Sequence, residues 1–231
     1  SLLPLDKELD VPMVAKVIAQ RLLKLNIGSD TKVHLLAQIA RIDQQHARSS
    51  AIFAPVTRTP FYCAGCPHNS STKVPKGSRA AAGIGCHFMV QWMDRNTETF
   101  SQMGGEGAMW AGCAHFTAEA HQFVNLGDGT YFHSGSLAIR QSLAAGANIT
   151  YKILFNDAVA MTGGQSVDGI LTMPQLTHQL FHEGVLEIVV LADDPKQIKQ
   201  SDLAQGVYLG HRDELETVML RLREKQGLSV I

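Results

Sequence analysis

Two short stretches carry the residues best suited to chemistry in this sequence of 231 residues. The first is the Gly-Asp-Gly-Thr motif at 127–130, and the second is Asn156-Asp157, with 26 residues between Gly129 and Asn156. One carboxylate, one amide oxygen and nearby main-chain carbonyls suit a hard divalent cation such as Mg2+, which takes few protein ligands and binds substrate phosphates. The glycines and a following helix start offer N–H groups to an anion. The pattern therefore predicts a site for magnesium and a diphosphate.

Two strands and a helix must position these stretches. Residues His121–Leu126 are predicted to form a strand, Ser134–Ala145 a helix, and Ile149–Phe155 a strand rich in β-branched and aromatic residues. Such a strand–helix–strand unit joins two parallel strands by a right-handed crossover. Asp128 and Asn156 are then expected just beyond the carboxyl ends of these strands. Ligands bind at that edge of an open α/β sheet.

A segment with cysteines precedes this unit. Cys63 and Cys66 are two residues apart, a spacing that lets both thiolates bind one metal or cluster, and Cys86 follows in Gly83-Ile-Gly-Cys. Tight Cys-x-x-Cys spacing in a chain that looks non-secreted favours metal or redox chemistry over disulfides. Plain packing in a turn is the alternative for this pair. Gly83 and Gly85 suggest that the backbone closely approaches another group, with tight packing as the alternative. Cys113 is more typical of a small core residue.

The first part of the sequence predicts helices without chemistry. Apolar residues recur at helical spacing from Pro12 to Leu25 and from Asp30 to Ile42, and a connector with prolines follows. We therefore divide the chain into a helical lead-in and connector at 1–57 and one larger domain at 58–231.

The region after Asn156 predicts alternating helices and strands. In order these are helix 174–183, strand 185–192, helix 213–226 and a strand beginning at 228. Strands that alternate with helices indicate an α/β fold, a doubly wound parallel sheet with helices on both faces.

Composition excludes several classes of protein. Hydrophobic residues make up 45% and charged residues 18%, and the net charge of −1 gives no electrostatic reason to expect nucleic acid or membrane binding. The sequence has no apolar run of about 18 residues and no signal peptide, so we expect a cytoplasmic protein without a membrane span. The chain opens on Ser and closes on what looks like a strand cut short. We interpret it as a segment of a longer polypeptide.

Four motifs together resemble one family. The Gly-Asp-Gly motif, with an Asn closing the next strand, resembles the diphosphate-and-metal motif of thiamine-diphosphate enzymes. Adding Cys-x-x-Cys-Pro-His at 63–68, Gly-Ile-Gly-Cys at 83–86 and Met-Thr-Gly-Gly-Gln at 161–165 narrows the likeness. The set is similar to the thiamine-diphosphate-binding segment of 2-oxoacid:ferredoxin oxidoreductases, and within them to the fused bacterial indolepyruvate ferredoxin oxidoreductases. The match covers roughly Arg58 to Asp194.

The resemblance implies a magnesium site and a diphosphate site. Asp128, the side chain of Asn156 and the main-chain carbonyl of Ala158 would hold Mg2+. The residues implied to contact the diphosphate belong to the glycine motif and to the turn after the second strand: Gly127, Gly129, Thr130, Asn156, Asp157, Ala158, Val159, Ala160 and Met161.

The resemblance also implies an iron–sulfur centre beside the cofactor. His68 and Cys86 would lie near the cofactor, and Cys63, Cys66 and Cys86 would be three ligands of a [4Fe–4S] cluster. The family's fourth cysteine tends to follow the strand that begins at 228, so it is expected outside this chain. Cys113 is a substitute that the family does not usually use.

The activity implied is oxidative decarboxylation of an aryl 2-oxo acid, indolepyruvate-like, to acyl-CoA and CO2. Electrons would pass through iron–sulfur centres to ferredoxin. A pyrimidine-binding domain, in the same polypeptide or a second protomer of a homodimer, would complete the cofactor site and supply the activating glutamate. This chain alone is therefore expected to bind cofactor poorly and to be inactive.

Three other interpretations stay open. The 2-oxo acid could instead be pyruvate or a branched-chain acid. A nicotinamide-binding Rossmann protein is more distant, because Phe132 stands where the third glycine belongs. A non-catalytic module is the remaining alternative, with Cys63, Cys66, Cys86 and a histidine or Cys113 holding structural zinc at a partner interface.

Overall fold

The computed structural model describes residues 3–4, 8–51, 58–156, 158–169 and 171–231. The chain divides into two compact units, Ser1–Arg58 and Thr59–Ile231, each described here by itself. None of the helices in these described ranges is long and apolar enough to cross a bilayer.

The smaller unit is a pair of helices, α1 (Val11–Leu22) and α2 (Ser29–Ala51). Asp10 caps α1 by accepting a hydrogen bond from the N–H of Met13, and Pro12 fits the first turn, where its missing N–H costs nothing. Both helices were predicted, although α2 continues beyond the predicted end at Ile42 to Ala51, a stretch that holds neither Gly nor Pro.

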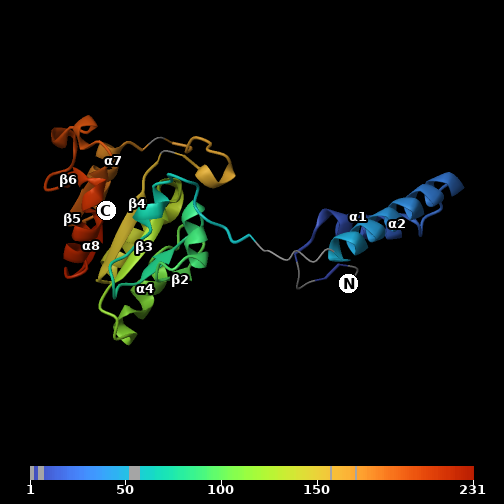
Figure 1. Ribbon diagram of the computed structural model, residues 1–231, viewed down its shortest axis with the longest axis horizontal. Helices are drawn as coiled ribbons and strands as arrows, with labels where there is room; N and C mark the ends of the chain where they lie inside the picture. Colours follow the sequence, from blue (N-terminus) through green and yellow to red (C-terminus); the bar gives the residue numbers. More distant parts are fainter. Residues whose placement is uncertain (1–2, 5–7, 52–57, 157, 170) are drawn as a thin grey trace. The chain divides into compact units, whose positions relative to one another are not determined.

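The larger unit is built on a parallel sheet of seven strands, counted over the described residues. Their order is β2-β1-β3-β4-β7-β5-β6, and each neighbouring pair is parallel. Figure 1 shows β3 and β4 side by side in the middle of this unit. The strands are β1 (Ala80–Ala82), β2 (Thr97–Phe100), β3 (Gln122–Gly127), β4 (Ile149–Leu154), β5 (Glu187–Ala192), β6 (Tyr208–His211) and β7 (Leu228–Val230).

Helices cover both faces of the sheet. The helices are α3 (His68–Ser71), α4 (Ala108–Cys113), α5 (Asp128–Thr130), α6 (Ser136–Ala144), α7 (Met173–His182) and α8 (Leu215–Leu222). Ile139 of α6 and Leu180 of α7 pack with Leu126 in the main core, whereas Met219 of α8 packs with Phe123 on the opposite face. The predicted doubly wound α/β fold is confirmed.

The structure differs from the predicted elements in several places. Strands β1, β2 and β6 were not predicted, because they are short and β1 consists of three alanines, which have little strand propensity. The helix expected to start at Ser134 starts at Asp128 and passes through a π-helical turn, Tyr131–Gly135, before α6. Helix α8 starts at Leu215, after the 3-10 turn Arg212–Glu214.

Candidate functional site

Asp128 joins the ends of the two central strands. The register of β3 and β4 runs from Gln122 opposite Ile149 to Gly127 opposite Leu154, so both strands end at the same level. The carboxylate of Asp128, 8% exposed, accepts the N–H of Gly129 through Oδ1 at 2.8 Å and the N–H of Asn156 through Oδ2 at 2.9 Å. The acidic group is therefore fixed at the carboxyl edge of the sheet, as the parallel-strand argument expected.

A cavity of about 360 Å³ opens beside this carboxylate. It brings together every predicted cofactor residue that the structure describes: His68, Cys86, Gly127, Asp128, Gly129, Thr130, Asn156, Ala158, Val159, Ala160 and Met161. Asp157 was also predicted but lies outside the described residues. The side chains of Cys63 and Cys66 are not part of the cavity wall.

One side of the cavity is formed by the loop that follows β4, which is held together by hydrogen bonds between its own residues. The Oδ1 of Asn156 accepts the N–H of Ala158 at 3.1 Å, and the N–H of Val159 donates to the carbonyl of Gln165 at 2.8 Å. The side chains of Thr162 and Gln165 hydrogen bond to each other at 2.7 Å. Thr162 lines the cavity, whereas Gln165 does not line it and instead hydrogen bonds to Thr162 within the loop.

Two histidines form another part of the wall. His87 is 2% exposed, and its ring lies nearly parallel to that of His68, with 6.4 Å between centroids. Burial lowers the pKa of His87 to about 4 and also lowers that of His68, where the charge of Asp128 opposes it. Both imidazoles are therefore neutral at pH 7. Within the described residues the Nε2 of His87 has no hydrogen-bond partner.

The close approach expected at Gly83 and Gly85 is made by two side chains. A Cβ at Gly83 would lie 1.9 Å from the Oε1 of Glu106, and a Cβ at Gly85 would lie 2.8 Å from the His87 ring. Glu106 is 0% exposed, and burial raises the pKa of its carboxyl although it accepts the N–H of Gly104 at 2.7 Å. Only glycines admit these two side chains beside the loop.

Sequence reasoning did not assign His87, Met103 or Val167 to the cavity, yet all three line it. For His87 a signal exists, because it directly follows Cys86 and a glycine pair. Met103 and Val167 are ordinary apolar residues, and nothing in their types distinguishes them from core residues.

Cys63, Cys66 and Cys86 lie near one another without forming a disulfide. All four are free, and Cys113, at the end of α4, is exposed. The Sγ of Cys66 is 3.4 Å from the Nδ1 of His68. Burial raises the pKa of the Cys86 thiol, and the thiols of Cys66 and Cys63 raise it further. Across the part of the chain that is described, no three side chains of His, Cys, Asp or Glu are grouped to hold a metal ion.

The fold and the cavity define an α/β domain that binds a ligand at the carboxyl ends of its central parallel strands. The chain belongs to the thiamine pyrophosphate enzymes: their C-terminal TPP binding domain matches residues 83–231. The predicted thiamine-diphosphate-binding segment is thereby confirmed.

This chain matches only a part of the length of its relatives. The indolepyruvate oxidoreductase subunit IorA of Thermococcus kodakarensis is 26% identical over 194 residues, which are 71% of this chain and 29% of that protein. This chain thus spans less than a third of that relative.

Two solved structures share the fold. A 2-oxoglutarate:ferredoxin oxidoreductase from Magnetococcus marinus has a TM-score of 0.55 and 20% identity, covering 77% of this chain and 63% of that one. Benzoylformate decarboxylase from Polynucleobacter necessarius has a TM-score of 0.51 and 16% identity, covering 77% of this chain and 34% of its own.

Proposed function

We propose that this chain binds the diphosphate and Mg2+ of thiamine diphosphate within an oxidoreductase that decarboxylates a 2-oxo acid. The observation that carries the proposal is the carboxylate of Asp128, held between the ends of β3 and β4 on the wall of a cavity of about 360 Å³. A divalent cation with few protein ligands needs such an anchored carboxylate.

The residues around the cavity suit the two parts of the cofactor head. Asp128, the side chain of Asn156 and the carbonyl of Ala158 would hold the cation. The helical run that begins at Asp128 starts at the cavity. Apart from the N–H of Gly129, which donates to Asp128, the N–H groups of its first turn would bind the diphosphate together with the turn Ala158–Met161. Gly127 and Gly129 keep side chains out of the way of the anion.

When bound, thiamine diphosphate supplies the carbanion and the electron sink for decarboxylation. The chain's own part is orientation and a defined charge. His68 and His87 present neutral rings to the cavity, because burial lowers the pKa of each. Neutral imidazoles leave the positive charge near the anion to the metal and the main-chain dipoles, and they add hydrogen-bonding groups without repelling a cationic ring.

We further propose the wider reaction of the oxidoreductase. Its substrate is an aryl 2-oxo acid of the indolepyruvate kind, and its products are acyl-CoA and CO2, with ferredoxin as electron acceptor. The name of the IorA relative favours this substrate. Pyruvate or a branched-chain 2-oxo acid is the second candidate. A pyrimidine-binding domain, in the same polypeptide or in the other protomer of a homodimer, completes the site of this cytoplasmic enzyme.

Cys63, Cys66 and Cys86 are proposed ligands of a [4Fe–4S] cluster whose fourth ligand comes from outside the chain. The described side chains are not grouped as a metal site, so no electron-transfer step is assigned to these residues. Metal and sulfide analysis of protein purified without oxygen tests the ligation. Iron with sulfide and a broad visible absorbance is the expected result, whereas stoichiometric zinc would support the structural-zinc module instead.

Calorimetric titration with thiamine diphosphate and Mg2+ tests the cofactor site. Asp128→Ala is expected to lower the affinity for thiamine diphosphate with Mg2+ at least about tenfold. Removing even a residue that only hydrogen bonds to a metal ligand lowers metal affinity by that factor. Asp202→Ala removes an exposed carboxylate far along the chain from the motif and should leave the affinity unchanged.

Two further titrations sharpen this experiment. Free thiamine lacks the diphosphate, so its weak binding should not respond to Asp128→Ala. Adding a pyrimidine-binding domain should strengthen binding to the wild type. Equal affinities of wild type and Asp128→Ala for thiamine diphosphate, with that domain present, would show that Asp128 holds no metal.

A further inference from the structure

A buried lysine lies in the middle of the sheet, away from the proposed cofactor contacts. Lys152 stands on β4 and is 2% exposed. Its Nζ is 5.9 Å from the centre of the Phe123 ring. Burial, and to a lesser extent the charge of Arg95, lower the pKa of Lys152 to about 7. A lysine is rarely fully buried without a partner, because removing its charge from water is costly.

The partners of Lys152 are two main-chain carbonyls at the end of α3. Its Nζ donates to the carbonyl of Ser71, the last residue of α3, at 2.8 Å and to that of Lys73 at 3.0 Å. Carbonyls at a helix end have no partner within the helix, and the N–H groups of a lysine there satisfy them.

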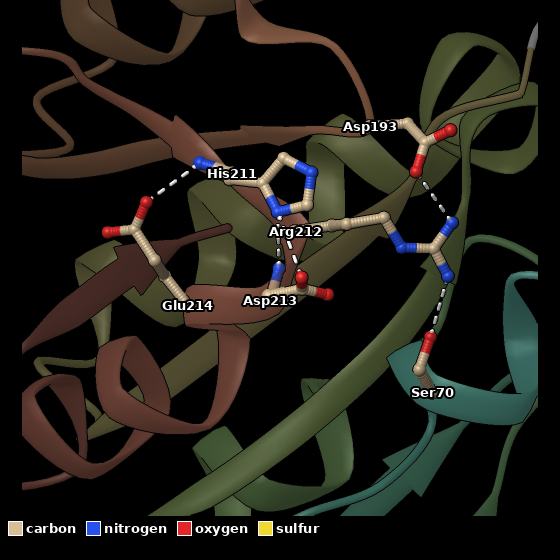
Figure 2. A network of polar contacts seen from close by, with 6 residues as sticks. All are labelled: Ser70, Asp193, His211, Arg212, Asp213 and Glu214. Atoms are coloured by element: carbon tan, nitrogen blue, oxygen red, sulfur yellow. Dashed lines mark hydrogen bonds and ion pairs between the residues drawn. The ribbon is translucent and has the colours of Figure 1, made fainter.

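Two arginines hold the same short helix from other elements. The guanidinium of Arg95 donates to the carbonyl of Asn69 at 2.8 Å. Figure 2 shows Arg212 between Ser70 and Asp193: its Nη2 donates to the Oγ of Ser70 at 3.0 Å, and its Nη1 is 3.3 Å from the carboxylate of Asp193. Of the three cations, Lys152 alone is buried.

Helix α3 carries groups of the cavity at its first turn. His68 begins α3 and lines the cavity, and its carbonyl accepts the hydroxyl of Thr72 at 2.6 Å. Cys66 is held 3.4 Å from the imidazole of His68. The helix has four residues, so a shift at its end moves His68 and Cys66 as well.

We propose that Lys152 is the positioning residue of the Cys63–His68 segment: its buried side chain, bound to the carbonyls of Ser71 and Lys73, fixes where His68 meets the cavity and where Cys66 lies beside His68. The value of this placement for cofactor binding rests on the proposed function. The placement itself does not, and it can be measured without any cofactor.

The titration of Lys152 makes the opening of α3 depend on pH. Opening of α3 that brings Lys152 into water raises its pKa from about 7 to an ordinary lysine value, roughly 10.4. Above pH 7 the open state therefore binds more protons than the closed state, and opening becomes harder as the pH rises. Below pH 7 both states are protonated, and opening does not depend on this group.

The other titrating groups near this segment bound the useful range of pH. His68 and His121, on the elements packed against Lys152, have lowered pKa values and are neutral above pH 7. The pKa of Cys86 is raised, and Arg95 keeps its charge. Between pH 7 and 8.5 neither histidine changes its charge, and the part of the dependence on pH that Lys152→Met abolishes is the part due to Lys152.

Amide hydrogen exchange measures the opening directly. The N–H groups of Ser71, Thr72 and Lys73 are hydrogen bonded to preceding carbonyls and report on α3. After correction for intrinsic exchange, their protection in the wild type should rise by up to about tenfold per pH unit from pH 7 to 8.5. Amides of α2, which belongs to the other compact unit, serve as the internal reference and should show no such rise.

Two variants complete the test. In Lys152→Met the side chain keeps its length but loses its charge and donors, so α3 should lose protection and its dependence on pH. Lys196→Met, at an exposed lysine, should behave as wild type. A flat wild-type profile, unprotected α3 amides in the wild type, or the same slope in Lys152→Met would overturn the proposal. If Lys152→Met does not fold, the wild-type profile decides alone.

Discussion

The two faces of strands β3 and β4 carry different kinds of side chain. On one face Val124, Leu126, Ile149 and Tyr151 are buried in the main core beneath α4, α6 and α7. On the other face Phe123 is buried against Met219, but the same strands also place Asn125 directly opposite Lys152 in the register, and both of these polar side chains are buried. Successive residues of a strand point to opposite faces, so this division follows from the alternation alone.

The difference between the two faces indicates that one stabilises the fold and the other positions the segment that carries His68. The apolar face gains free energy from burial of hydrocarbon in proportion to the area removed from water. The polar face contains groups that are costly to bury, and Lys152 uses its hydrogen bonds to hold the segment that carries His68. Strands β3 and β4 thus support the fold with one face and arrange the cavity wall with the other.

The largest effect is expected on the apolar face. Leu126→Ala removes a side chain that is 0% exposed and packs against Gly135, so the free energy of unfolding should fall by about 2–5 kcal/mol. Urea denaturation followed by circular dichroism measures it. The matched control is Leu186→Ala at a position 90% exposed, which should change the free energy by less than about 0.5 kcal/mol. Similar losses in both variants would contradict the assignment of this face as the core.

Much of this arrangement could be predicted from the sequence, because local rules govern it. Ile149–Leu154 is rich in β-branched and aromatic residues, and the glycine motif directly follows the preceding strand. Parallel strands end at one edge, so the meeting of Asp128 and Asn156 follows from spacing. The same motifs also indicate the thiamine-diphosphate family.

The remaining features depend on contacts between distant parts of the chain. Ala80–Ala82 forms a strand because its neighbours β2 and β3 pair with it, not because alanine favours strands. A lysine within a strand is expected to point to solvent. Lys152 is buried because α3 packs over it and offers the carbonyl of Ser71 as a hydrogen-bond acceptor. The ring of His87 fits its place because Gly85 lacks a side chain, a relation that no periodicity reveals.

The smallest effect, and one of opposite sign, is expected on the polar face. Asn125 is 0% exposed, and among the described residues neither atom of its amide has a hydrogen-bond partner. Asn125→Leu keeps a similar volume and removes a polar group that is costly to bury unpaired. The free energy of unfolding should therefore stay equal or rise by up to about 1 kcal/mol in the same urea experiment.

Asn148→Leu is the matched control for this sign. The amide of Asn148 accepts the N–H of Gly227 at 2.8 Å and donates to the carbonyl of Ala120 at 3.2 Å, so its loss leaves two main-chain groups unpaired. That variant should lose about 1–2 kcal/mol. If Asn125→Leu loses as much, the amide of Asn125 is hydrogen bonded in solution, and buried water must then be part of the polar face. An unchanged or higher stability of Asn125→Leu would mean that Asn125 lowers the stability of the fold or adds nothing to it. That is expected of a face that arranges the cavity wall rather than one that stabilises the fold.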